Sequence, residues 1–79
     1  MVQPIIVNAI WDAESKVWIA ESDGVPGLAT GANTLEELVE KLRIAMPELL
    51  TENGVSFEAD RLLFKIDAER SEYANIPTD

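Results

Sequence analysis

Carboxylates are the only abundant side chains in this sequence that could take part in catalysis. There are 15 acidic residues against six basic ones, and neither histidine nor cysteine occurs. Acids that converge from neighbouring strands can hold divalent metal ions, and Glu21, Asp67 and Glu69 lie in segments predicted to be strands. The first predicted strand, however, offers Asn8 at its middle and no acid. We therefore expect no metal site, no cofactor and no catalytic residue, with a metal-dependent nuclease as the weaker alternative.

The missing residue types also exclude most nucleophilic chemistry. Histidine is the commonest general base and the commonest metal ligand, and a chain without cysteine has no thiolate zinc site and no disulfide. A serine nucleophile would then need a lysine as its base. Ser15 and Lys16 are adjacent, but both lie in a polar segment predicted to be an exposed turn. Such a turn offers no means of activating either group.

Length and charge narrow the function further. The 79 residues allow one domain with a thin core, and such domains usually need a disulfide, a metal or an oligomer for support. We therefore expect a homodimer or a higher homo-oligomer. The formal net charge of -9 would repel nucleic acid and attract a basic protein. No segment is apolar enough to cross a membrane and the N-terminus lacks the basic start of a signal peptide, so a cytoplasmic protein is expected.

The first two predicted strands form a hairpin. Gln3–Trp11 and Val17–Ser22 are rich in β-branched and aromatic residues, and the polar residues between them form its turn. If Trp11 pairs with Trp18, one face of the hairpin is free of charge and has two alanines that let a helix approach closely. We assign this face to the core: Ile5, Val7, Ala9, Trp11, Trp18 and Ala20.

The opposite face of the hairpin is also largely apolar, with Asn8 and Glu21 as its polar members. One helix cannot cover both faces of a sheet, and a second apolar face in so small a protein indicates an interface. We predict that this face forms a dimer interface, made by Ile6, Ile10, Val17, Ile19 and Leu63.

Two further segments complete the predicted sheet. Pro26–Gly27 suits a type II turn, and Leu28–Ala32 follows it as a short edge strand. Arg61–Glu69 alternates apolar and polar residues, and a strand that follows a helix is expected to lie parallel to the first strand. Residues 1–70 are then one α+β domain, a three-stranded antiparallel meander with one helix and a fourth, parallel strand. Residues 71–79 form a polar tail.

The helix between the third and fourth strands has a clear start and end. Thr34 and Glu37 form a capping box, and Asn53–Gly54 supplies the stop. Pro47 lies inside this span and is expected to kink or split the helix. One apolar stripe recurs at helical spacing: Leu35, Leu38, Val39, Leu42, Met46, Leu49 and Leu50.

The assembled pattern resembles a known family. Glu21–Thr30 reads ESDGVPGLAT, and after a short spacer Thr34–Leu38, TLEEL, opens the helix. A Pro-Gly turn and a capping box at this spacing are similar to the signature of the HicB-like antitoxin superfamily. Trp11–Asp12, Val17–Ser22 and Pro47–Leu50 are more similar still to a small branch described only as a domain of unknown function. The resemblance covers residues 5–68.

This resemblance implies a β-β-β-α-β fold, a degenerate half of the ribonuclease H-like architecture. It also implies a role, because such antitoxins dimerise and cover a small, basic, mRNA-cleaving toxin of double-stranded-RNA-binding fold. Members usually carry an operator-binding module after the last strand. Here only Ser71–Asp79 follow that strand, so direct binding to nucleic acid is not part of the expectation.

We therefore predict a non-catalytic, antitoxin-like protein-binding module that neutralises a small basic toxin. A stand-alone regulatory domain that binds another protein is the alternative. Binding would rest on charge and shape complementarity. The residues predicted to bind the basic partner are the acids of the turns and the helix: Asp12, Glu14, Glu21, Asp23, Glu36, Glu37 and Glu40.

Overall fold

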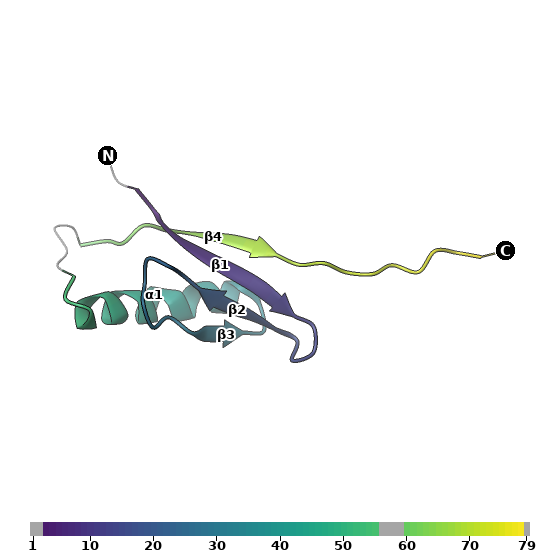
Figure 1. Ribbon diagram of the computed structural model, residues 1–79, viewed down its shortest axis with the longest axis horizontal. Helices are drawn as coiled ribbons and strands as arrows, with labels where there is room; N and C mark the ends of the chain where they lie inside the picture. Colours follow the sequence, from purple (N-terminus) through teal and green to yellow (C-terminus); the bar gives the residue numbers. More distant parts are fainter. Residues whose placement is uncertain (1–2, 56–59, 79) are drawn as a thin grey trace.

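The computed structural model describes residues 3–55 and 60–78, which form a four-stranded mixed sheet and one helix (Figure 1). Strands β1 (Ile5–Asp12) and β2 (Val17–Glu21) form the predicted antiparallel hairpin. Trp11 pairs with Trp18, which confirms the predicted register. The hairpin turn closes with a hydrogen bond of 2.7 Å from the Lys16 amide to the Asp12 carbonyl.

The predicted type II turn after β2 is confirmed. The Leu28 amide donates to the Val25 carbonyl at 3.1 Å, and Gly27 has a φ of 88°, which a residue with a side chain rarely adopts. Strand β3 (Thr30–Ala32) is shorter than predicted because the turn directs Leu28 into the core instead of the sheet.

The sheet order is β3-β2-β1-β4, so that β3 and β4 are its two edges. Strand β4 (Phe64–Glu69) runs parallel to β1, as predicted, and gives the molecule its α+β fold. It begins three residues later than the predicted start at Arg61. The reason is that β1 begins at Ile5, which lies opposite Phe64, so earlier residues have no strand beside them.

Helix α1 (Leu35–Glu52) begins at the predicted cap. The Thr34 hydroxyl accepts a hydrogen bond of 3.1 Å from the Glu37 amide. The Glu37 carboxylate lies 3.7 Å from Lys41 Nζ and not at the Thr34 amide, so that only half of the capping box forms. At the other end, the Asn53 amide donates to the Leu49 carbonyl at 2.9 Å, which confirms the predicted stop.

Pro47 does not split α1, which is continuous from Leu35 to Glu52. Of the two predicted effects, a kink or a split, the split is wrong. The missing Pro47 amide removes one hydrogen bond to the preceding turn, but Met46 and Leu50, which precede and follow it in the apolar stripe, are buried in the core. Packing of this apolar stripe offsets the loss of one helical bond.

The Thr34 cap leads to a first prediction. Thr34→Ala leaves the Glu37 amide without its side-chain acceptor and is expected to lower the free energy of unfolding by about 1 kcal/mol. Thr51→Ala in the exposed last turn is the matched control, because it makes the same chemical change without removing a cap, and should alter stability by less than ~0.5 kcal/mol. Urea unfolding followed by circular dichroism measures both; equal losses would mean that the cap contributes nothing.

The core lies between α1 and the face of the sheet predicted to bury it. The Cα atoms of α1 come within 8 Å of β2 and β3 but not of β1 or β4, so its side chains cover only part of the sheet. Within residues 3–55 and 60–78, no polar or charged side chain is buried. The buried residues are Val7, Ala9, Trp18, Ala20, Val25, Leu28, Ala32, Leu38, Leu42, Met46 and Leu50.

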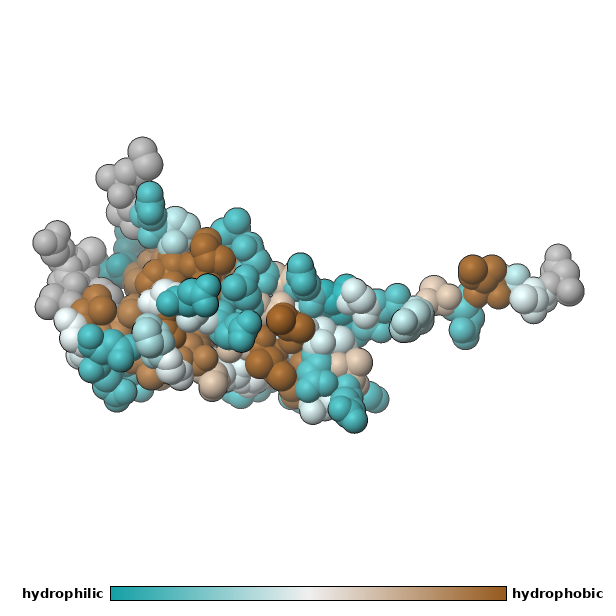
Figure 2. Space-filling model, viewed as in Figure 1, coloured by the Kyte–Doolittle hydropathy of each residue, from teal (hydrophilic) through white to brown (hydrophobic). Residues whose placement is uncertain are grey.

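The chain continues beyond β4 as an exposed tail, residues 71–78, which has neither helix nor strand. The tail runs on in the direction of β4 and stands clear of the body (Figures 1 and 2), which makes the molecule 63 Å long but only 27 and 19 Å across. In the described parts of the chain, no helix is long and apolar enough to span a membrane.

Candidate functional site

The face of the sheet turned away from α1, here called the outer face, carries exposed isoleucines. Side chains alternate along a strand, so burial of Val7 and Ala9 on one side of β1 places Ile6, Asn8 and Ile10 on the other. Ile10 lies opposite Ile19 of β2. The exposed fractions of Ile6, Ile10 and Ile19 are 39, 50 and 45%. The outer face therefore has an apolar centre that no part of the described chain covers.

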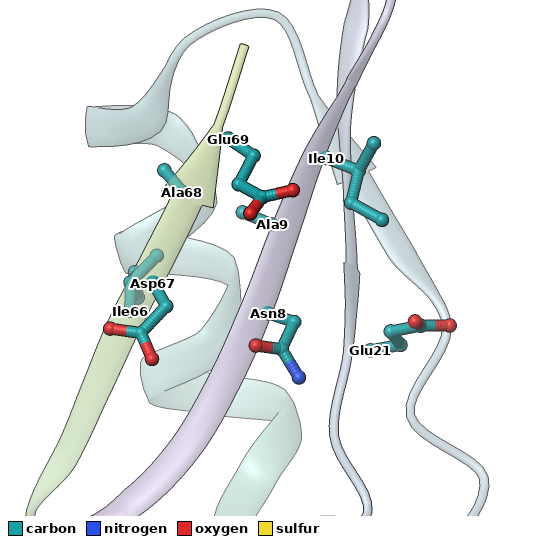
Figure 3. A pocket seen from close by; sticks show the side chains of 8 residues that line it. All are labelled: Asn8, Ala9, Ile10, Glu21, Ile66, Asp67, Ala68 and Glu69. Carbon is teal, nitrogen blue, oxygen red and sulfur yellow. The ribbon is translucent and has the colours of Figure 1, made fainter.

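Acidic side chains lie beside these isoleucines in two rows across the strands. In one row Asn8 lies between Glu21 of β2 and Asp67 of β4; in the next, Ile10 lies between Ile19 and Glu69. Figure 3 shows the three carboxylates on the same side of the sheet, with the helix behind it. They line a shallow hollow of about 570 Å³.

The charge of the outer face is predominantly negative. Among the strand residues, the outer face has one basic side chain, Lys65, which lies opposite Ile6 in the pairing of β4 with β1. The Nζ atom of Lys65 lies 3.4 Å from the Asp67 carboxylate. Both side chains are more than half exposed, so this pair contributes little to stability. Glu21 and Glu69 remain as excess negative charge, which suits a cationic side chain of a partner better than an anionic one.

The acids predicted to bind a partner do not form a single cluster. Glu21 belongs to the outer face, and Asp23 lies in the turn after β2. Asp12 has a structural role, since its Oδ1 accepts from the Glu14 amide at 3.0 Å and from the Ser15 amide at 3.4 Å. The structure therefore separates the hairpin-turn acids from Glu21.

The helix acids lie on the opposite side of the sheet from the outer face. Glu36, Glu37 and Glu40 are exposed in the first turns of α1. Glu37 lies 3.7 Å from Lys41, and Glu40 lies 3.5 Å from Arg43. Their charge is thus partly compensated within the helix, whereas the outer face has a net excess.

The residues predicted to form a dimer interface are placed as follows. Ile6, Ile10 and Ile19 form the apolar centre of the outer face, Val17 at its end is half-buried, and Leu63 is exposed just before β4 begins. The alternation of the strands thus predicted correctly which side each strand residue faces.

The described parts of the chain contain no candidate site for a metal ion. There, no three acidic side chains lie close enough together to hold an ion. The three carboxylates of the outer face are spread over two rows and three strands. The arrangement is suited to contact with a surface and not to coordination of one atom.

Sequence reasoning missed two features. The first is the position of Asn8 between Glu21 and Asp67, which follows from the register of β4 on β1. The second is an apolar groove between α1 and β4, whose walls include Val39 and Phe64. The alternation of apolar and polar residues in β4 could have indicated this groove, because one helix cannot cover the apolar residues of all four strands.

Comparison with known proteins places this architecture in a family. A family model described as a domain of unknown function (DUF1902) matches residues 4–76. The chain belongs to the DUF1902 family. That description assigns no activity to the DUF1902 domain.

A solved relative shares the fold of this DUF1902 chain. It is a hypothetical protein from the extremely thermophilic bacterium Thermus thermophilus, with 51% sequence identity and a TM-score of 0.78. The match covers 90% of this chain and 99% of that one. Among curated proteins, no sequence matches. Function must therefore be inferred from the surface itself.

Proposed function

We propose that this DUF1902 chain is a non-catalytic protein-binding module whose outer face binds a small basic protein. The observation that carries the proposal is the combination of exposed Ile6, Ile10 and Ile19 with Glu21, Asp67 and Glu69 on one uncovered sheet face. Protein interfaces commonly have an apolar centre and a polar rim. The isoleucines would supply buried area, and the carboxylates would select the partner's charge.

Self-association through the outer face is less favourable than binding of a basic partner. In a symmetric contact the same patch meets itself, so Glu21, Asp67 and Glu69 would face a surface with the same excess of negative charge. Lys65, the one basic side chain on these strands, already lies 3.4 Å from Asp67. Like charges at an interface oppose binding, and a basic partner avoids that cost.

The resemblance to HicB-like antitoxins supports a specific partner class. A small basic mRNA-cleaving toxin binds RNA through a cationic surface, and the outer face has the opposite sign and an apolar centre against which such a surface could pack. Neutralisation would follow because the bound module blocks access of RNA. No chemistry by the module itself is required.

The test is co-expression of the chain with each small basic protein encoded beside its gene. We expect a stable complex at low ionic strength that weakens as salt is added, because exposed charge pairs are screened. Mass spectrometry of the intact complex gives its composition. Failure of every such neighbour to bind would contradict an antitoxin-like role.

Two double charge reversals locate the binding surface. Asp67→Lys with Glu69→Lys changes the outer face and is expected to weaken the complex by more than about tenfold. Glu36→Lys with Glu40→Lys changes exposed helix residues by the same charge and should leave affinity within about threefold. Isothermal titration measures both. The reverse ranking would transfer the binding site to the helix acids.

A further inference from the structure

Strand β4 leaves one edge of the sheet open. It lies outside β1 in the strand order, and in the described chain no strand pairs with its other side. With six residues it is twice as long as β3, the other edge, and it contains no proline or glycine. Exposed edges of this kind present unpaired backbone amides and carbonyls that another strand can bind.

An apolar groove runs beside this edge on the helix side. Phe64 and Ile66 of β4 and the preceding Leu62 form one wall, and Val39 and Pro47 of α1 lie on the other, with Arg43 of α1 as the charged side chain that lines both hollows. The two adjoining hollows measure about 370 and 290 Å³. The Cα atoms of α1 lie more than 8 Å from those of β4, and the groove between them leaves Phe64 and Ile66 only half-buried.

The tail has the properties of a strand without a partner. Ile76 is 84% exposed, and Tyr73 is fully exposed. Arg70 stacks on Trp11 at 3.9 Å and its Nε lies 2.6 Å from Glu72, so the start of the tail is held in line with β4. From there the chain leads away from the sheet and α1 (Figure 1).

The tail is long enough to pair with the β4 edge of a second copy, and the alternation of its side chains matches that of β4. The eight residues 71–78 span about 26 Å when extended, which exceeds the ~20 Å of a six-residue strand. Antiparallel pairing about a two-fold axis at Arg70 sets Ile76 opposite Phe64 of the second copy. Paired residues point to the same side of a sheet, so Ile76 enters the groove. Pro77 falls just beyond the strand, where its missing amide is not needed.

We infer that two copies of this chain dimerise by exchanging their C-terminal tails, each tail adding a strand to the open β4 edge of the other. The exchange is reciprocal, as a two-fold interface requires. It joins two sheets through their β4 edges and leaves both outer faces uncovered. The inference does not depend on a basic partner, and its test needs the purified chain alone.

Engineered cysteines test the pairing directly, because the chain has none of its own. One preparation carries Phe64→Cys and another carries Ile76→Cys. After the two are mixed and mildly oxidised, a disulfide between positions 64 and 76 can form only between chains. We expect this heterodimer to predominate on a non-reducing gel, with the linkage identified by peptide mass spectrometry. A mixture of Ile44→Cys and Ile76→Cys is the control, since Ile44 is exposed on α1 away from the groove.

Sedimentation of point variants supplies an independent measurement that does not require oxidation. Ile76→Asp is expected to raise the dimer dissociation constant by more than about tenfold, and the exposed-site control Ile44→Asp should not change it. Ile19→Glu, on the outer face, should also leave the dimer intact.

Three results would overturn tail exchange. A monomeric parent chain excludes it. A chain with both cysteines that closes only within itself would show that the tail occupies its own groove. A dimer lost with Ile19→Glu but kept with Ile76→Asp would place the interface on the outer face.

Discussion

Leu42→Ala is expected to lower the free energy of unfolding by about 2–5 kcal/mol. Leu42 is completely buried in the centre of the helix stripe, where it belongs to a core shared with Val7 and Ala9. Truncation removes apolar contacts and leaves a cavity that the sheet cannot fill without moving. A domain of this size has a total stability of only about 5–10 kcal/mol, so the variant should lose a large fraction of that stability.

The matched control is Ile44→Ala, two residues along the same helix. Ile44 is 66% exposed, so its truncation should change stability by less than ~0.5 kcal/mol. Urea unfolding followed by circular dichroism, at identical helix content in the native state, compares the two variants. Similar losses for both would mean that α1 is not held by the burial pattern described above.

Ala9→Leu is the second change with a large expected effect, a loss of about 1–3 kcal/mol. Ala9 is fully buried and lies opposite Ala20 beneath the helix, where both side chains are small. The added atoms have no space unless α1 moves away from the sheet, which would also expose Leu38 and Leu42. Thermal unfolding and the dispersion of amide NMR signals report the two effects separately.

Ala68→Leu is a stringent control for this prediction. Ala68 lies opposite Ala9 in the pairing of β4 with β1 and faces the same side of the sheet, but it is exposed because α1 does not reach β4. It should be tolerated within ~0.5 kcal/mol. If Ala9→Leu were tolerated equally well, the packing of the core over Ala9 would not depend on a small side chain there.

Local signals in the sequence predicted most of the fold. The two tryptophans indicated the hairpin register because aromatic cross-strand pairs are favourable. Thr34 indicated the start of the helix because its hydroxyl can accept a hydrogen bond from a free amide of the first turn. The errors arose where distant elements decide. Arg61 was assigned to β4, although the strand can begin only where β1 offers a partner. The split at Pro47 was overruled by packing against the sheet.

The candidate site was predicted in part, for the same reason. Alternation along β1 and β2 identified the outer face, including Ile10 and Ile19, without knowledge of the sheet order. The row formed by Glu21, Asn8 and Asp67 depends on how β4 is aligned with β1. That alignment is determined by the whole connection through α1, whose geometry a local pattern does not contain. The groove beside β4 depends likewise on where α1 crosses the sheet.

The contact between the two tryptophans provides the molecule with an intrinsic fluorescent probe. The sequence has two tryptophans, and their ring centroids are 5.4 Å apart, with the Arg70 guanidinium over Trp11. Indole fluorescence depends on such neighbours, so any event that shifts Arg70 should change the emission of this tryptophan pair. The beginning of the tail can therefore be observed in real time without attaching a dye.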